Sequence, residues 1–350
     1  MSEADAVAAV LWVGATAYAV FGGADFGAGF WSLVAGPNEK GKRARDLADW
    51  AIGPVWEANH VWLIFVLVVL WSGFSSAFEA IFSTLFIPLT LAALGIVLRG
   101  SGFAFHKTAQ RLVGRSASER LFGISSLFTP FFMGTVIGAV ASGRVPVGNA
   151  AGDPVTSWLN LASIVIGVLF LATSAYLSAV FLVHDARRAG APDLEQYFGK
   201  RALAAAVAAG ALAVGGLFAL RADARYVYDG LTGDGLPLVI VSALAGIAVL
   251  VLLQRGKPRG TRPLAVIAVA AVVWGWAVAQ HPYLLPKQLT ISQAAAPDST
   301  LTAILIVFGA AAVLVIPAFA LLYTLAQRSL IEEAPSPPPA AQTVETRRAP

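Results

Sequence analysis

The sequence lacks cysteine altogether and is poor in charged residues. Without cysteine, disulfide bonds, thiolate metal sites and covalent c-type haem attachment are excluded. Charged residues make up only 13% of the 350 residues, against about 25% in soluble domains, and hydrophobic residues reach 57%. With a mean hydropathy of +0.73, this is the composition of an integral membrane protein.

Long apolar runs take the place of the missing charge. A helix needs roughly 20 apolar residues to cross a hydrocarbon core of about 30 Å. Alternating ten-residue strands of an outer-membrane barrel are absent, so the sequence predicts an all-α membrane fold. We expect nine transmembrane helices, arranged as two four-helix bundles plus one extra helix. The predicted spans are 6–34, 51–73, 77–98, 120–142, 157–183, 201–220, 236–254, 263–280 and 301–325.

The distribution of basic residues predicts the orientation. Of the 24 lysines and arginines, 20 fall in the connections after the first, third, fifth and seventh spans or in the C-terminal segment. Because cytoplasmic loops carry the excess of basic residues, the N-terminus is expected outside and the C-terminus in the cytoplasm. The basic balance therefore reports topology, and we expect no nucleic-acid partner.

Both ends of the chain differ from the spans. The opening MSEADAVAAV has two acids and no basic region, so we expect no cleavable signal peptide. The closing EEAPSPPPAAQTVETRRAP is rich in proline and alanine, which is typical of a disordered segment. We expect one polytopic membrane domain over residues 1–330 and a disordered cytoplasmic tail over 331–350.

Asp25 and Glu57 are the only acids more than one turn inside a predicted span. Asp25 lies about nine residues from the cytoplasmic end of its helix, and Glu57 about six residues, or roughly 9 Å, from the start of the next. Two carboxyl groups at similar depth on consecutive helices predict a proton relay open to the cytoplasm. Alternatively, each is a neutral hydrogen-bonding group of the helix interface, or Glu57 is shallow enough to meet interfacial water.

Glycines surround Asp25 in the string FGGADFGAGFW. Gly23 and Gly27 form a small-xxx-small face that lets another helix approach closely. Such packing would shield Asp25 from lipid.

Four other side chains are candidates for a functional role: three lie near these acids, and one lies at the end of a span. His60, one turn after Glu57, is a candidate relay group, packing residue or haem ligand, although the spans hold no second histidine for a bis-His site. Trp56 is typical of an interfacial aromatic belt, or it packs on a partner's haem or quinone. Asn59 shares the same stretch. Arg99 ends the third span, and we expect it to snorkel to the interface rather than pair with a carboxylate or propionate.

The remaining histidines, His106, His184 and His281, are expected at the surface. His106 and His184 are assigned to cytoplasmic loops and His281 to the outer end of the eighth span. Metal-ligand clusters, a glycine-rich phosphate loop and a nucleophile elbow are missing from the sequence.

Several strings together resemble a known family. GADFGAG at residues 23–29 is followed about 30 residues later by PVWEANHVWL at 54–63, then by LRGSGFAFH at 98–106 and FTPFFMGTVIGAVASG at 128–143. Their order and spacing resemble subunit II of cytochrome bd-type quinol oxidase, and the WEANHVWL string is the most specific. The predicted nine helices with an outer N-terminus agree with that family.

The resemblance implies a function that the residues alone do not give. In such oxidases, subunit I holds two b-type haems, a d-type haem and the quinol site, and oxygen is reduced to water. Subunit II is its pseudo-symmetric partner in the bacterial cytoplasmic membrane, with no haem ligands, polar residues on a proton path, and in some cases a structural quinone. The family's proton-path acids fall on Glu57 and Asp25, and Trp56 and Asn59 match the rest of the motif. Small accessory subunits and lipid are further expected partners.

The match has departures, and rival functions stay open. Relatives often have a second Asp where this chain has Gly22, Asp-Gly where it has Glu57-Ala58, and Gln or Glu in place of His60. The residues also fit a secondary transporter with ion-binding acids in its first two helices. A purely structural assembly subunit is the third possibility.

Overall fold

The computed structural model describes residues 2–53, 56–104 and 115–327, and this part of the chain is almost wholly helical. The long elements are α1 (Glu3–Ala17), the π-helical turn η1 (Tyr18–Gly22), α2 (Gly23–Val34), α4 (Trp56–Gly73), α6 (Phe86–Ala104), α8 (Arg115–Ala141), α9 (Leu161–Arg188), α10 (Pro192–Asp223), α12 (Leu236–Gln254), α13 (Thr261–Gln280) and α15 (Asp298–Gln327). The short ones are α3 (Glu39–Ile52), α5 (Ser75–Thr84), α11 (Arg225–Thr232), β1 (Tyr283–Leu285), β2 (Leu289–Thr290) and α14 (Ile291–Ala294).

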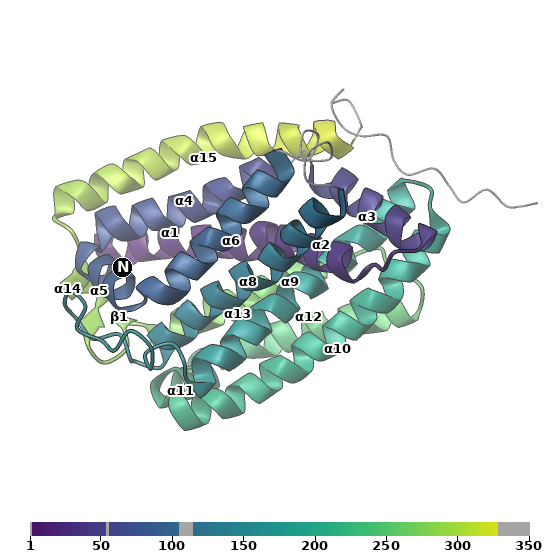
Figure 1. Ribbon diagram of the computed structural model, residues 1–350. Coiled ribbons are helices and arrows are strands. Elements are labelled where there is room, and N and C mark those ends of the chain that lie inside the picture. Colours follow the sequence, from purple (N-terminus) through teal and green to yellow (C-terminus); the bar gives the residue numbers. More distant parts are fainter. Residues whose placement is uncertain (1, 54–55, 105–114, 328–350) are drawn as a thin grey trace, which may run out of the picture.

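The described residues contain eight helices long and apolar enough to span a membrane, with α1, η1 and α2 counted as one. Helices α5 and α6 are bent by 86° at the break between them and give a ninth candidate crossing when the pair is counted as one span. The nine crossings coincide with the nine predicted spans. Successive crossings run in opposite directions, so α2, α9 and α12 finish at the end of the bundle where α3 lies, which we call the α3 end (Figure 1).

One prediction was wrong in detail, because residues 77–98 do not form a single straight helix. The break falls at Leu85, whose backbone leaves the helical region at φ −102° and ψ 28°. Pro88 favours the break, because it has no N–H and its ring would clash with the carbonyl of Thr84 in a continuous helix, although Pro130 and Pro317 lie inside unbroken helices. In the observed fold Pro88 lies in the first turn of α6, where a proline is tolerated.

The connections hold more structure than the sequence suggested. The helix α3 fills most of the first connection, and its N-cap Asn38 accepts a hydrogen bond from the Gly41 N–H at 2.8 Å. The predicted loop 221–235 contains α11, and 281–300 contains the antiparallel pair β1–β2 and α14. The loop expected at 184–200 is only three residues long, because α9 extends to Arg188 and α10 starts at Pro192.

Glycine in α2 allows close helix contacts, as the sequence predicted. A Cβ added at Gly27 would lie 1.9 Å from the carbonyl oxygen of Ser174 on α9. A Cβ at Gly29 would lie 2.0 Å from Oγ of Ser126 on α8. Both distances are far below van der Waals contact, so α2 fits between α8 and α9 only because these positions carry no side chain.

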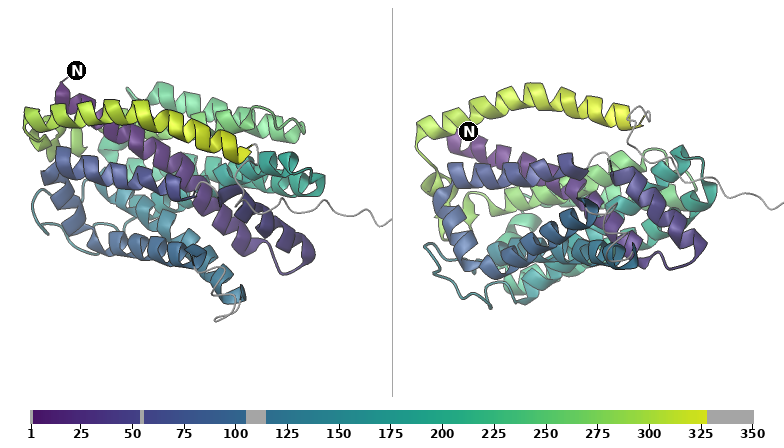
Figure 2. Two further views of the ribbon diagram at one scale, coloured as in Figure 1. Left: turned by 90° about the horizontal axis from the view of Figure 1, so that it is seen from above. Right: turned by 45° about the horizontal axis from the view of Figure 1, so that its top comes forward.

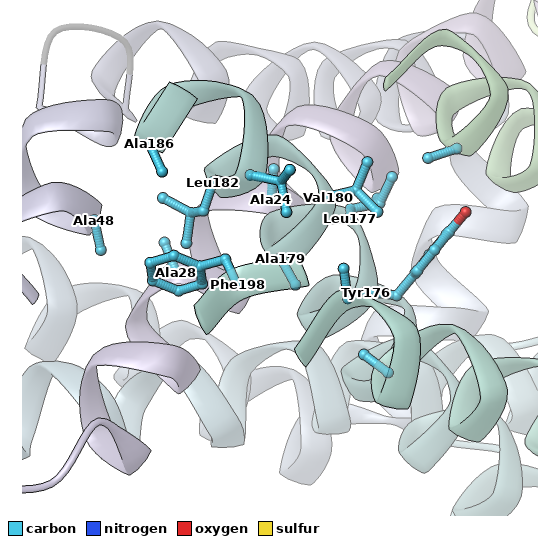
Figure 3. Packing of buried hydrophobic residues seen from close by; sticks show 14 of the residues in the cluster. Ala24, Ala28, Ala48, Tyr176, Leu177, Ala179, Val180, Leu182, Ala186 and Phe198 are labelled. Carbon is cyan, nitrogen blue, oxygen red and sulfur yellow. The ribbon is translucent and has the colours of Figure 1, made fainter. Parts of the chain in front are cut away.

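The largest apolar core is built around α9. Small residues of α2 (Ala24 and Ala28) face Leu177, Leu182 and their neighbours on α9, and Phe198 of α10 closes the cluster on the other side (Figure 3). Ala48 and Leu47 of α3 extend the same core at the α3 end. This packing holds α2 at the centre of the molecule, with Asp25 on it.

The extra helix of the predicted arrangement is α15. It lies along one side of the molecule, beside α1 and α4 (Figures 1 and 2). Phe308 and Phe319 of α15 pack against Phe65 and Trp62 of α4, with ring centroids 5.8 Å apart in both pairs. Much of its remaining surface is exposed and apolar, as a face toward lipid or another membrane subunit would be.

The expected tail, residues 331–350, lies outside the described residues, as does His106. His184 is not in a loop: it lies in the last turns of α9, half-buried, with Nε2 3.1 Å from the hydroxyl of Thr261. His281 follows α13 and is exposed, as expected.

Candidate functional site: a buried carboxyl cluster

Asp25 and Asn59 form a direct contact between the first and second crossings. Nδ2 of Asn59 donates to Oδ2 of Asp25 at 2.9 Å, and both residues are only 2% exposed. Asp25 sits in the first turn of α2, directly after the π-helical turn η1, and Asn59 in the first turn of α4. A buried carboxyl group is stable only with such partners, so this hydrogen bond fixes its position.

Arg99 of α6 completes the surroundings of Asp25. One of its terminal nitrogens, Nη2, donates to the backbone carbonyl of Asp25 at 2.8 Å, and Nη1 donates to the hydroxyl of Ser126 on α8. The guanidinium carbon lies 5.0 Å from the ring centre of Phe26 and 4.4 Å from that of Phe122. We call Asp25, Asn59, Arg99 and Ser126 the Asp25 cluster.

The expected snorkelling of Arg99 was therefore wrong. Arg99 is 1% exposed and is the largest fully buried side chain in the described residues. A buried guanidinium is costly unless its donors are satisfied. Here the two terminal nitrogens bridge α2 and α8 and two aromatic rings cover the group, while Nε has no hydrogen-bond partner among the described residues. The alternative weighed from the sequence, a place beside a carboxyl group, is closer to what the fold shows.

Glu57 points away from the Asp25 cluster. It lies two residues before Asn59 on α4, so the two side chains are about 200° apart around the helix axis. Asn59 is buried against Asp25, whereas Glu57 is exposed on the surface of this chain. The two acids of the predicted relay are thus joined through one turn of α4, with one on its inner face and the other on its open face.

His60 and Trp56 lie beside the cluster. Nδ1 of His60 is 2.8 Å from the carbonyl oxygen of Trp56, and its half-buried ring packs edge-on against Tyr18, Phe26 and Trp56 at centroid distances of 6.5, 6.1 and 5.8 Å. Both residues therefore belong to the wall around Asp25, whichever further role His60 has.

A cavity of about 150 Å³ opens next to Asp25 and Asn59 and reaches the α3 end. Its far wall carries Asp185 and Arg188 from α9 and Arg262 from α13. The sequence had not singled out these residues, because Asp185 was assigned to a loop and nothing in the chain links it to Arg262. An acid followed three residues later by a basic residue at a helix end was the available signal.

The described residues contain no group of three or more His, Cys, Asp or Glu side chains able to hold a metal ion. The Asp25 cluster contains a carboxyl group hydrogen-bonded to an amide, with a hydroxyl group nearby, and it lies next to a cavity. Such groups can accept, orient and release protons.

Comparison with known proteins identifies the family of this chain. The family described as cytochrome bd terminal oxidase subunit II matches residues 4–326. A protein of Bacillus subtilis (strain 168), provisionally named a cytochrome bd menaquinol oxidase subunit II, is 26% identical over 326 residues, covering 89% of this chain and 91% of its own length. Cytochrome bd ubiquinol oxidase subunit 2 of the same strain is 29% identical over 161 residues, which is 46% of each protein.

The fold supports the same assignment. The structure of bd oxidase from Geobacillus thermodenitrificans includes a chain that superposes with a TM-score of 0.74 at 25% identity, covering 93% of this chain and 98% of that one. This multi-pass membrane protein belongs to the cytochrome bd terminal oxidase subunit II family and is a subunit of a respiratory quinol oxidase.

Proposed function

We propose that the chain carries protons from the cytoplasm toward the oxygen-reducing site of its haem-bearing partner. Asp25 and Asn59 form the buried stage of this path, Glu57 passes the proton to the partner, and His60 assists. Trp56 and Arg99 support the path by packing and by fixing the backbone of Asp25.

The hydrogen bond from Asn59 to Asp25 is the observation that carries this proposal. It connects a buried carboxyl group to the helix whose opposite face presents Glu57. An ionisable residue within a membrane is costly, so its retention at a packed interface favours a use in proton movement. Glu57 on the open face of α4 is where a second membrane subunit could receive the proton.

We extend the proposal to the remaining parts of the complex on the resemblance to the family. Two b-type haems and a d-type haem would be held by subunit I, which also oxidises the quinol. The complex would reside in the bacterial cytoplasmic membrane, with the α3 end of this chain facing the cytoplasm. A structural quinone, lipid and small accessory subunits are further candidate partners.

Two rival functions make different demands. A secondary transporter, with ion-binding acids in its first two helices, is not favoured, because the family and the fold are those of an oxidase subunit. A scaffold that moves no protons would share the same fold, and the experiment below separates it from the proposed function.

The test compares Glu57→Gln with Glu79→Gln in the assembled oxidase. Both acids are exposed on this chain, and Glu79 lies on α5, away from the Asp25 cluster. We expect Glu57→Gln to slow quinol oxidation by at least about tenfold at normal haem content, because a proton-transfer group is lost. Glu79→Gln should match the parent. Equal turnover of the two variants would show that Glu57 transfers no protons, and a purely structural subunit would be the remaining function.

A further inference from the structure

The cavity beside Asp25 is lined by six polar residues among seven apolar ones. It lies among α2, α4, α9 and α13, with the end of α3 as part of its wall. The polar residues that line it, from the Asp25 end to the α3 end, are Asp25, Asn59, Ser178, Asp185, Arg188 and Arg262. At about 30 Å³ for each molecule in liquid water, its volume of about 150 Å³ has room for several waters.

Ser178 marks the level of Asp25 on α9. A Cβ added at Gly27, two residues after Asp25, would lie 2.6 Å from Cβ of Ser178. Asp185 is seven residues further along α9, or about 10 Å toward the α3 end. Two carboxyl groups separated by roughly this distance are too far apart for direct proton transfer, but a short chain of waters spans it.

Asp185 is held in place by basic residues from two helices. Nη2 of Arg262 lies 2.8 Å from each of its carboxylate oxygens, and Nη2 of Arg188 lies 3.7 Å from one of them. Arg188 in turn lies over the ring of Trp50 on α3, 4.5 Å from its centre. Asp185 is only 6% exposed, whereas Arg188 is exposed, so this ion cluster stands where the cavity meets the surface of the α3 end.

We propose that this cavity is a hydrated vestibule that delivers protons from the α3 end to Asp25, with Asp185 as the carboxylate at its mouth and Arg262 as the residue that positions it. The inference rests on the proposed proton path and names its entrance. Two arginines and one carboxylate give the mouth a net charge of +1, which disfavours hydrated metal cations, whereas a proton moves by exchange of O–H bonds.

The transfer balances at each step. The Asp185 carboxylate first takes a proton from the solvent at the α3 end and then releases it to the first water, as that water passes one of its own protons onward. The last water donates to the Asp25 carboxylate, and Asp185 is again a carboxylate. No oxidant or other reactant is needed, because only O–H bonds break and form.

Blocking the vestibule without touching an acid is the first arm of the test. Ala51, at the end of α3, lines the cavity and is half-buried, so Ala51→Leu fills the space. Ala209→Leu on α10 is the matched control, because Ala209 is also half-buried but lies outside the cavity lining. Both variants are assayed as the assembled oxidase in vesicles, by haem content, quinol oxidation and proton uptake from the α3 side.

Neutralising the mouth is the second arm. Asp185→Asn is compared with Asp193→Asn, which breaks another ion pair at the same end, the 2.6 Å contact with Arg43, outside the cavity. We expect Ala51→Leu and Asp185→Asn to slow proton uptake and turnover by about tenfold at normal haem content, with both controls near the parent. Added formate should partly restore Asp185→Asn, since a small acid can replace the missing carboxyl group, but not Ala51→Leu.

The outcomes separate the vestibule from the path that it serves. If Glu57→Gln is slow while Ala51→Leu and Asp185→Asn behave like their controls, protons enter elsewhere and the vestibule is wrong. If Glu57→Gln is as fast as the parent, the proposed function itself fails. Where Asp185→Asn does not assemble, Ala51→Leu decides alone.

Discussion

At the scale of single residues, Arg99 does more to define the site than either acid. Its guanidinium bridges the Asp25 carbonyl on α2 and the Ser126 hydroxyl on α8. Both hydrogen bonds are buried, and losing the guanidinium removes them, leaving Ser126 with its bond to the Phe122 carbonyl. The position of Asp25 therefore depends on an arginine 74 residues away in the sequence.

Replacing Arg99 should destabilise the subunit. Arg99→Leu removes two buried hydrogen bonds from a charged donor, each worth about 1.5–3 kcal/mol, so the midpoint of thermal haem loss from the complex should fall. Arg99→Lys should recover only part of this, because an ammonium group lacks the planar fork. Arg255→Leu, at an exposed arginine just after α12, is the control. An Arg99→Leu complex as stable as this control would show that the bridge is not structural.

The sequence foretold the residues of this site better than their contacts. Asp25, Asn59 and Glu57 could be selected because polar groups inside apolar runs are few. The burial of Arg99 could not be predicted, because a long basic side chain at the end of a span usually reaches the membrane interface. In this fold Arg99 is instead held inside by its contacts with Ser126 and Phe122. Asp185 was missed for a similar reason: its partner Arg262 is 77 residues away.

At the scale of helices, hydropathy located the crossings but not their breaks. An apolar run reads the same whether it is straight or bent, and residues 75–104 are apolar throughout most of their length. Pro88 lies just after the 86° bend, but a proline alone did not predict it, because Pro130 and Pro317 lie inside the continuous helices α8 and α15. The close contact of α2 was easier to foresee, because glycine spacing reports small-residue packing directly.

Adding one methyl group at Gly27 should disturb this packing. In Gly27→Ala the new Cβ would lie 1.9 Å from the Ser174 carbonyl oxygen, which forces α2 and α9 apart. Overpacking of this kind costs about 1–3 kcal/mol, so thermal haem loss should begin at lower temperature and assembly should decrease. Gly210→Ala on α10 is the matched control, because nothing lies within 4 Å of its added Cβ. Equal behaviour of the two variants would contradict the tight contact.

At the scale of the whole molecule, most of the basic connections and the opening of the cavity lie at the same end. The α3 end holds the ion pair of Arg43 with Asp193 and the cluster of Asp185 with Arg262. It is also the end at which most of the basic connections lie, which predicts that it faces the cytoplasm. A proton path that opens there would take its protons from the cytoplasmic side.

The natural absence of cysteine makes this orientation simple to test. Lys257→Cys and Ala151→Cys each place a single exposed thiol in a connection, the first at the α3 end and the second at the opposite end. In intact cells a membrane-impermeant thiol reagent should label Ala151→Cys, whereas Lys257→Cys should react only after permeabilisation. The reverse labelling pattern would show that the α3 end faces outward, opposite to the predicted topology.

The central claim is that protons pass through this subunit, and proton uptake measures it most directly. The fully reduced oxidase, reconstituted in vesicles, is mixed with oxygen, and proton uptake from the α3 side is followed with a pH indicator in the parent and in Glu57→Gln. The account predicts that Glu57→Gln still binds oxygen but takes up protons at least about tenfold more slowly. Proton uptake at the parental rate, in a variant with normal haem content, would contradict it.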